Sequence, residues 1–117
     1  MIPAPVDDVL QRAVDDSLEC FAACEETVEQ CLAIAGDDAD TRLVNTLITT
    51  AAVCDAAAYF SRNSDRLRRE ALRFCAEQTE RCAEACDERP ADPQLATCAR
   101  LCRICSRSCR KAVLTLV

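Results

Sequence analysis

The sequence predicts an all-α fold, an antiparallel up-down-up-down four-helix bundle in one domain, 1–117. The chain of 117 residues is long enough for one domain and short for two. Its single glycine argues against an all-β fold, which needs many tight turns. Within each cluster, neighbouring cysteines stand three, four or seven residues apart, which keeps their side chains on one stripe of an α-helix.

Each helix is delimited by residues that start or stop helices. The first is expected at about 6–35, because prolines precede it and Gly36 suits a helix C-terminus. The second, at about 38–61, follows that glycine, and the polar segment after it supplies caps for the third, at about 65–88. Pro93 suits the first turn of the fourth helix, at about 93–114. Short links between long helices predict antiparallel neighbours.

An internal repeat of 55 residues relates the two predicted helical hairpins. Adding 55 to the inward positions of the first half gives those of the second half, and each helix uses heptad spacing. Stacking these positions predicts four layers: Cys20, Cys54, Cys75 and Cys109; Cys24, Thr50, Thr79 and Cys105; Thr27, Leu47, Cys82 and Cys102; Cys31, Leu43, Cys86 and Cys98. The core is therefore expected to be a tube lined by sulfur, with the threonines as neutral fillers.

Composition excludes several classes of function. The net charge of -6 disfavours a nucleic-acid partner, because phosphates would repel the chain. The absence of histidine removes Ser-His-Asp and Cys-His catalysis and mixed Cys/His zinc sites, and we expect no enzyme. The first residues do not resemble a signal peptide, and no apolar stretch is expected to span a membrane. A cytoplasmic protein is expected, where many cysteines indicate metal or redox chemistry rather than disulfides.

The cysteine pattern predicts a site for a soft metal ion. Cysteine also serves as a small core residue, but leucine would fill these axial positions better and without risk of oxidation. Thiolates select Cu(I), zinc and iron–sulfur clusters, and Cu(I) accepts two or three sulfurs, so pairs four residues apart on a helix suit it. We predict several Cu(I) ions per chain. The candidate ligands are Cys20, Cys24, Cys31, Cys54, Cys75, Cys82, Cys86, Cys98, Cys102, Cys105 and Cys109.

The motifs on three of the predicted helices resemble those of the bacterial copper storage proteins. They are Cys20-x3-Cys24, Cys82-x3-Cys86 and Cys98-x3-Cys102-x2-Cys105-x3-Cys109. The resemblance implies a cysteine-lined bundle that holds many Cu(I) ions, a cytosolic store when no export signal is present, and assembly into oligomers. Two features depart from the family: Leu43, Leu47 and Thr50 replace thiols on the second helix, and the chain has no histidine and only Met1 as methionine. The loop end, near Cys31, Cys86 and Cys98, is the expected uptake route.

Two other interpretations stay open from the sequence. One is a zinc or iron–sulfur protein that uses the all-cysteine layer of Cys20, Cys54, Cys75 and Cys109. The other is a structural scaffold whose thiols bind no metal.

The second predicted helix is apolar all round, with Asp55 as its only charge between Leu43 and Ser61. Such a helix is expected to be buried all round, which predicts a homo-oligomer, a dimer or tetramer, packed through it.

Overall fold

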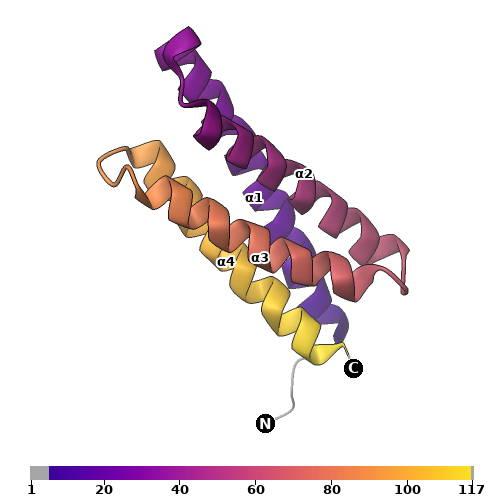
Figure 1. Ribbon diagram of the computed structural model, residues 1–117. Helices are drawn as coiled ribbons and strands as arrows, with labels where there is room; N and C mark the ends of the chain where they lie inside the picture. The colour runs from indigo at the N-terminus through magenta and orange to yellow at the C-terminus, as the bar shows by residue number, and fades with distance from the viewer. Residues whose placement is uncertain (1–5, 117) are drawn as a thin grey trace.

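The computed structural model describes residues 6–116 and shows four antiparallel helices (Figure 1). They are α1 (Val6–Ala35), α2 (Thr41–Asn63), α3 (Arg68–Asp87) and α4 (Pro93–Thr115), and the short 3-10 helix η1 (Gly36–Asp38) follows α1. Each α-helix packs against two neighbours, in the order α1, α2, α3, α4 and back to α1. The bundle is elongated, with extents of 49 × 28 × 17 Å. The predicted all-α four-helix bundle is confirmed.

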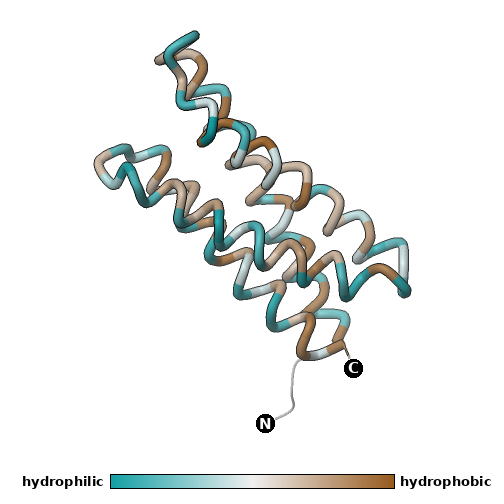
Figure 2. Tube along the Cα trace, viewed as in Figure 1, coloured by the Kyte–Doolittle hydropathy of each residue, from teal (hydrophilic) through white to brown (hydrophobic). Residues whose placement is uncertain are grey.

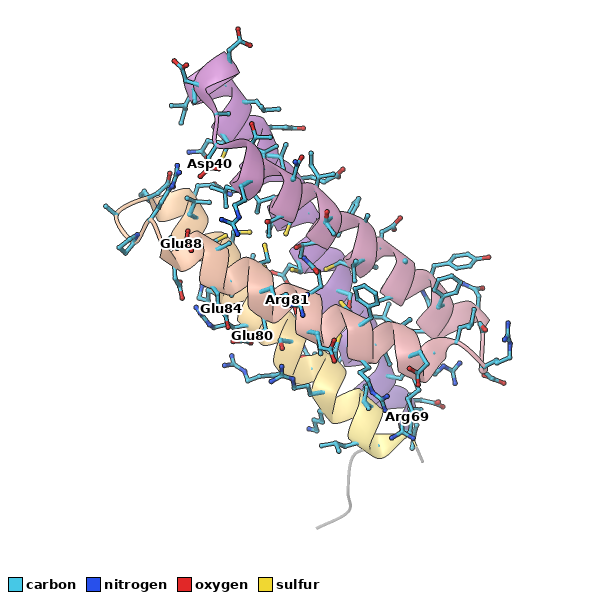
Figure 3. The ribbon with its side chains drawn as sticks, viewed as in Figure 1. Asp40, Arg69, Glu80, Arg81, Glu84 and Glu88 are labelled. Atoms are coloured by element: carbon cyan, nitrogen blue, oxygen red, sulfur yellow. The ribbon has the colours of Figure 1, made fainter. Side chains whose placement is uncertain are left out.

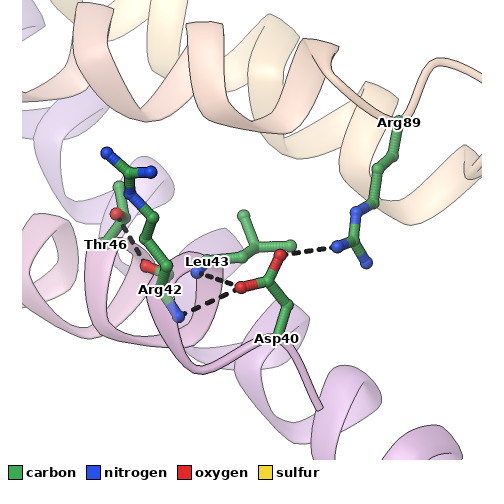
Figure 4. A network of polar contacts seen from close by, with 5 residues as sticks. All are labelled: Asp40, Arg42, Leu43, Thr46 and Arg89. Carbon is green, nitrogen blue, oxygen red and sulfur yellow. Dashed lines mark hydrogen bonds and ion pairs between the residues drawn. The ribbon is translucent and has the colours of Figure 1, made fainter. Parts of the chain in front are cut away.

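The second helix begins three residues later than the sequence suggested. Gly36 adopts a positive φ of 57°, and the chain makes one 3-10 turn before extending at Asp40. The Oδ1 of Asp40 accepts hydrogen bonds from the backbone N–H groups of Arg42 and Leu43, at 3.1 and 3.2 Å (Figure 4). Asp40 is therefore the N-cap, and it fixes the start of α2 at Thr41.

The start of the third helix also moves, whereas the fourth starts as expected. Leu67 donates its backbone N–H to the hydroxyl of Ser64 at 3.2 Å, so the chain turns once before α3 begins at Arg68 rather than 65. In α4, Asp92 caps the helix by accepting the N–H groups of Gln94 and Leu95 at 2.9 and 3.0 Å. Proline follows this cap at the first helical position, where its missing N–H costs nothing.

An ion pair joins the two hairpins at their loop end. The Oδ2 of Asp40 accepts a hydrogen bond at 2.5 Å from Arg89, which lies in the loop between α3 and α4 (Figure 4). Both side chains are half-exposed, so water screens the pair and its contribution to stability is small. The carboxylate of Asp40 thus has two roles, a helix cap on one oxygen and a contact with the other hairpin on its second oxygen.

Small side chains dominate the middle of the bundle core. Cysteines and alanines from all four helices are buried there, and polar and apolar positions alternate along each helix (Figure 2). Larger buried side chains lie towards the two ends: Val14 and Leu72 near the chain termini, and Leu95 near the loops. Because both ends contribute apolar packing, the bundle core does not consist of thiols alone.

Helix α2 corrects the expectation that no apolar stretch could span a membrane. By length and composition alone, Thr41–Asn63 is long and apolar enough to do so. A core helix of a globular protein can have the same composition. One face of α2 is buried in the bundle through Leu43, Leu47 and Cys54. Its other face leaves Ile48 and Tyr59 exposed, by 52% and 60%.

We expect Asp40→Ala to lower the free energy of unfolding of the reduced protein by about 1 kcal/mol, because α2 loses its N-cap. Asp40→Asn is the matched control, since asparagine is also a good N-cap but cannot form the ion pair with Arg89. It should stay within about 0.5 kcal/mol of the unmodified chain. Denaturant unfolding followed by circular dichroism measures both. Equal losses in the two variants would show that the ion pair, not the cap, matters.

Candidate metal centre

The thiols form a buried column inside the bundle. All eleven cysteines are free, and ten of them are buried; Cys31 is the partly exposed exception. Figure 3 shows sulfur atoms between the helices, whereas Arg81, Glu84 and Glu88 of the α3 region lie outside, where they are exposed. The helices thus turn their cysteines inward and their charges outward, as the heptad spacing predicts.

The column contains three groups of thiols. Within each group, every sulfur atom lies within 4.8 Å of the others. The outer group combines thiols of α1, α3 and α4, the middle group those of α1, α2 and α4, and the inner group those of α3 and α4. The outer group is Cys24, Cys82, Cys98 and Cys102; the middle group is Cys20, Cys54 and Cys105; the inner group is Cys75, Cys105 and Cys109.

The three groups are continuous with one another. Cys105 belongs to both the middle and the inner group. The Sγ atoms of Cys20 and Cys102 lie 3.5 Å apart, which joins the middle group to the outer one. Cys75 lies 3.9 Å from Cys54 and 3.8 Å from Cys105, so the inner group touches α2 as well. The thiols therefore make one array rather than separate sites.

The register between α1 and α4 differs from the predicted layers. Cys20 contacts Cys102 rather than Cys109, and Cys24 contacts Cys98 at 3.8 Å rather than Cys105. Each partner on α4 is thus seven residues from the expected one, or about two helical turns. The contact of Cys54 with Cys75 between α2 and α3 is as predicted. The four predicted layers are therefore wrong wherever they join α1 to α4, and the 55-residue repeat stays a prediction.

Heptad periodicity explains why the sequence could not fix this register. A slip of seven residues places every seam position on another seam position, so the spacing of the cysteines is satisfied equally well in both arrangements. Contacts outside the cysteines accompany the observed register. Gln94 of α4 donates a hydrogen bond to the hydroxyl of Thr27 at 3.0 Å, and Ser108 donates one to the carboxylate of Asp16.

The layer proposed for zinc or an iron–sulfur cluster is not assembled. Cys20, Cys54, Cys75 and Cys109 do not occur together in any of the three groups, because the slip of α1 carries Cys20 away from Cys109. Of the groups found within residues 6–116, only the outer one has four thiols, and it shares the column with the other two. An isolated tetrahedral site of the kind that structural zinc requires is thus not what these residues form.

The threonines of the core have hydroxyl groups that are already occupied. Thr27, Thr50 and Thr79 each donate to the backbone carbonyl four residues earlier, at 2.6 to 2.8 Å. In addition, the Thr50 hydroxyl accepts a hydrogen bond from Gln78 at 3.1 Å, as that of Thr27 does from Gln94. Helical threonine commonly bonds back in this way. These geometries agree with their expected role as fillers.

Neighbouring thiols shift one another's pKa values in both directions. Hydrogen bonding with Cys102, and next with Cys24, lowers the pKa of Cys82 to about 5. Hydrogen bonding with Cys102 also lowers the pKa of Cys98, whereas the pKa of Cys102 itself is raised, chiefly through Cys20. Hydrogen bonding with Cys105 raises the pKa of Cys109 to about 12. A metal ion that binds the protonated thiols must therefore displace their protons.

The sulfur separations suit a metal ion shared by two or three thiolates. With metal–sulfur bonds of about 2.3 Å, three sulfurs around one ion stand about 4.0 Å apart and two on opposite sides about 4.6 Å apart. The thiol contacts of 3.5 to 3.9 Å are slightly shorter than these separations, and the limit of 4.8 Å within each group is slightly longer. An ion could enter each group with little movement of the backbone.

Cys31 and Cys86 stand apart from the three groups. Cys31 is on the wall of a cavity of about 130 Å³ at the loop end, which Thr27, Asp92 and Gln94 also line. Cys86 is buried next to Cys82 and Cys98 without belonging to their group. Met1, the other sulfur considered from the sequence, lies outside the described residues.

Sequence reasoning missed Ser17, which contacts three thiols of the inner group. Its hydroxyl oxygen lies 3.6 Å from the sulfur atoms of Cys105 and Cys109 and 3.9 Å from that of Cys75. Ser17 lies three residues before Cys20, on the same heptad stripe. That spacing was visible in the sequence, but a search restricted to cysteines does not find it.

Comparison with protein families gives one match that covers nearly the whole chain. The sequence model described as "Copper storage protein" matches residues 6–114. A comparison with curated protein sequences finds no match.

Several solved structures share this fold. A protein from Nitrosospira multiformis is 24% identical, over 93% of this chain and 98% of the other, with a TM-score of 0.83. A histidine-to-alanine variant of Ccsp from Streptomyces lividans is 23% identical over 95% and 97%, with a TM-score of 0.87. The copper storage protein Ccsp from the same organism, loaded with 10 copper equivalents, is 24% identical over 97% and 93%, with a TM-score of 0.85. At these identities, the likeness shows the fold.

We expect a bulky maleimide to modify Cys31 first in the reduced native protein, because the other thiols are buried. Burial, and next the charge of Asp92, raise the pKa of Cys31, so the reaction should be slow but confined to this residue. Mass spectrometry should find a single early adduct, and further adducts after denaturation. Cys31→Ser is the control and should lack the early adduct. Several adducts formed at one rate would contradict a closed thiol column.

Proposed function

This chain belongs to the copper storage protein family, and on that premise we propose that it stores or buffers several Cu(I) ions on the thiolates of its core. The observation that carries the proposal is the continuous array of thiols, with sulfur contacts of 3.5 to 3.9 Å between helices. Thiolates prefer soft ions such as Cu(I), and an array with shared members can hold many ions in series.

We propose that the ligands of these ions are the eleven cysteines predicted from the sequence. The three groups supply nine of them, and Cys86 adjoins the outer group. At each protonated thiol, the ion replaces the proton, which leaves for solvent or for the ligand that delivered the copper. Thiolate charge is thereby offset inside the bundle without histidine or carboxylate ligands. A capacity of about one ion per one to two thiols follows from coordination by two or three shared sulfurs.

Storage rather than catalysis is the role that burial supports. Apart from Cys31, the thiols are buried inside the bundle, where an organic substrate could not reach them. Free thiols persist in a reducing compartment, so we also propose that the store is cytoplasmic. Partners for copper delivery and withdrawal would act at the surface of the bundle, by exchanging thiolate ligands with it.

We propose that Cu(I) enters at the loop end. The cavity of about 130 Å³ at this end is lined by Cys31, the single partly exposed thiol. The hydrogen bond between Gln94 and Thr27 lies between this cavity and the outer group. Both residues line the wall of the cavity, and one helical turn deeper Thr27 is followed by Cys24 on α1 and Gln94 by Cys98 on α4. Cys31 would then act as an early ligand, from which ions pass to the outer group.

We further propose that the protein is a homo-oligomer packed through α2. Ile48 and Tyr59 are exposed on its outer face, and Tyr59 stacks edge-on against Phe60 with ring centroids 5.6 Å apart. Asp55 is the only charge between Leu43 and Ser61. Association of two such faces would remove apolar side chains from water at the cost of burying few charges.

An anaerobic titration of the reduced protein with Cu(I), in competition with a chelator, tests the storage proposal. We expect saturation at several ions per chain. Cys102→Ser should lower the capacity by about one ion or more, because Cys102 belongs to the outer group and contacts Cys20. Cys31→Ser is the matched comparison: it should cost less capacity than Cys102→Ser and slow the uptake, because Cys31 lies outside all three groups.

The same titration decides against the other interpretations. Saturation with zinc at one or two ions and no competition for Cu(I) would indicate a zinc protein, and a brown anaerobic preparation with visible absorption would indicate an iron–sulfur cluster. No tight metal of any kind would leave only a structural scaffold. Each of these results would refute copper storage.

Light scattering at micromolar concentration tests the proposed oligomer. For the unmodified protein we expect a mass above that of one chain, which is 12.8 kDa. The measured mass should fall towards that of one chain in Ile48→Lys, because this substitution places a charge in the apolar face of α2. Phe74→Lys is the control, because Phe74 is similarly exposed, by 59%, but lies on α3. A monomer for the unmodified chain would refute association through α2.

A further inference from the structure

Ser17 occupies the place on α1 where the inner group would otherwise meet a fourth thiol. Its side chain is completely buried. Its hydroxyl oxygen contacts every sulfur of the group, at 3.6 Å for Cys105 and Cys109 and 3.9 Å for Cys75. The outer group, in contrast, receives the thiol of Cys24 from α1 and so has four members. Helix α1 thus contributes a hydroxyl to the inner group and a thiol to the outer group.

The hydroxyl of Ser17 differs from the other buried hydroxyls in how it is bonded. The three core threonines donate to the carbonyl four residues earlier, and Ser106 of α4 donates to the backbone carbonyl of Ala76 at 2.9 Å. Ser61 has no hydrogen-bond partner within the described residues. Over residues 6–116, every hydrogen-bond partner found for the Ser17 side chain is a sulfur atom. Its proton is therefore available to a thiolate rather than committed to the helix.

We propose that Ser17 is a positioning residue of the inner group, which donates a hydrogen bond to the thiolate of Cys105 or Cys109 and limits the group to three sulfur ligands. The inference rests on the proposed storage of Cu(I) and specifies how one part of the column binds it. A neutral thiol is a weak acceptor, whereas a thiolate is charged and accepts strongly. The bond therefore strengthens when an ion replaces the thiol proton, so Ser17 favours the loaded state.

Charge explains why a hydroxyl suits this position. Three thiolates around one Cu(I) already leave negative charge in a buried site, and a fourth thiolate would add to it. A hydroxyl adds no charge and offers a donor instead. The position of α1 is fixed nearby by the hydrogen bond from Ser108 of α4 to the largely buried carboxylate of Asp16. Ser17 is thus held between the helices that carry the group.

Two variants of Ser17 and one control separate this role from a structural one. Ser17→Ala removes the donor at the loss of a single heavy atom, and Ser17→Cys supplies the missing fourth thiol. Ser106→Ala makes the same chemical change at a buried serine whose proton goes to a backbone carbonyl. The readouts are Cu(I) competition against a chelator, capacity at saturation, and the midpoint of thermal unfolding with and without copper.

We expect Ser17→Ala to weaken the binding of the ion held by the inner group by about tenfold or more, since one hydrogen bond to a charged group is worth about 1.5 to 3 kcal/mol. The chelator should then withdraw this ion at a concentration at which the unmodified chain keeps it. The midpoint without copper should change little, because hydroxyl–thiol contacts are weak. Ser17→Cys should bind more Cu(I) at saturation. Ser106→Ala should lower the midpoint without copper but leave the competition unchanged.

The proposal fails if Ser17→Ala competes for Cu(I) as the unmodified chain does, or if Ser106→Ala weakens binding equally. It also fails if folded Ser17→Cys gains no capacity; if that variant does not fold, Ser17→Ala decides. The unmodified chain is measured in the same series. Absence of tight Cu(I) binding there refutes storage itself, whereas tight binding that does not respond to Ser17 refutes only this inference.

Discussion

Close packing of four helices around small side chains is the constraint on which the rest of the structure depends. Alanines such as Ala13, Ala76 and Ala83 are as fully buried as the cysteines beside them. Short side chains reach van der Waals contact only if the helix axes come close together, and a larger residue would force them apart. That close approach is what brings thiols of different helices to within 3.5 to 3.9 Å. The geometry for metal binding is thus present in the packing of the free thiols.

So many sulfur and oxygen atoms can be buried because the cost of burial is kept low in a different way for thiols, for hydroxyls and for charges. Thiols are weak donors and weak acceptors, so burying them costs little even when their only partners are other thiols. Hydroxyls are costlier, and those of Thr27, Thr50 and Thr79 are paired with backbone carbonyls. Charges stay outside, apart from the largely buried Asp16, whose carboxylate accepts from Ser108. The column therefore offers an ion sulfur in surroundings with few competing ligands.

The sequence was sufficient for the fold and for the burial of the cysteines, because both follow from spacing within one helix. It was insufficient for contacts between helices. The pairing of Cys54 with Cys75 was predicted correctly, whereas Cys20 meets Cys102 instead of Cys109. A heptad pattern is unchanged by a slip of seven residues, and the choice depends on contacts that have no period, such as Gln94 with Thr27. The start of α2 was missed because several aspartates could cap it: Asp40 makes the cap, rather than Asp37 or Asp38.

Helix α2 shows why one wall of the column lacks thiols. Leu43, Leu47 and Thr50 are buried at its inward positions, and Cys54 is its only cysteine. Replacing either leucine by cysteine would add a ligand but remove several buried carbon atoms, each worth about 0.8 kcal/mol of apolar transfer. These leucines lie near the loop end, opposite the apolar packing of Val14 and Leu72 near the termini. With apolar contacts at both ends, the bundle can fold before any ion arrives, unlike a zinc finger, whose folding energy comes from its metal. A store must keep its ligands in place both when empty and when full, and α2 contributes packing rather than capacity to that end.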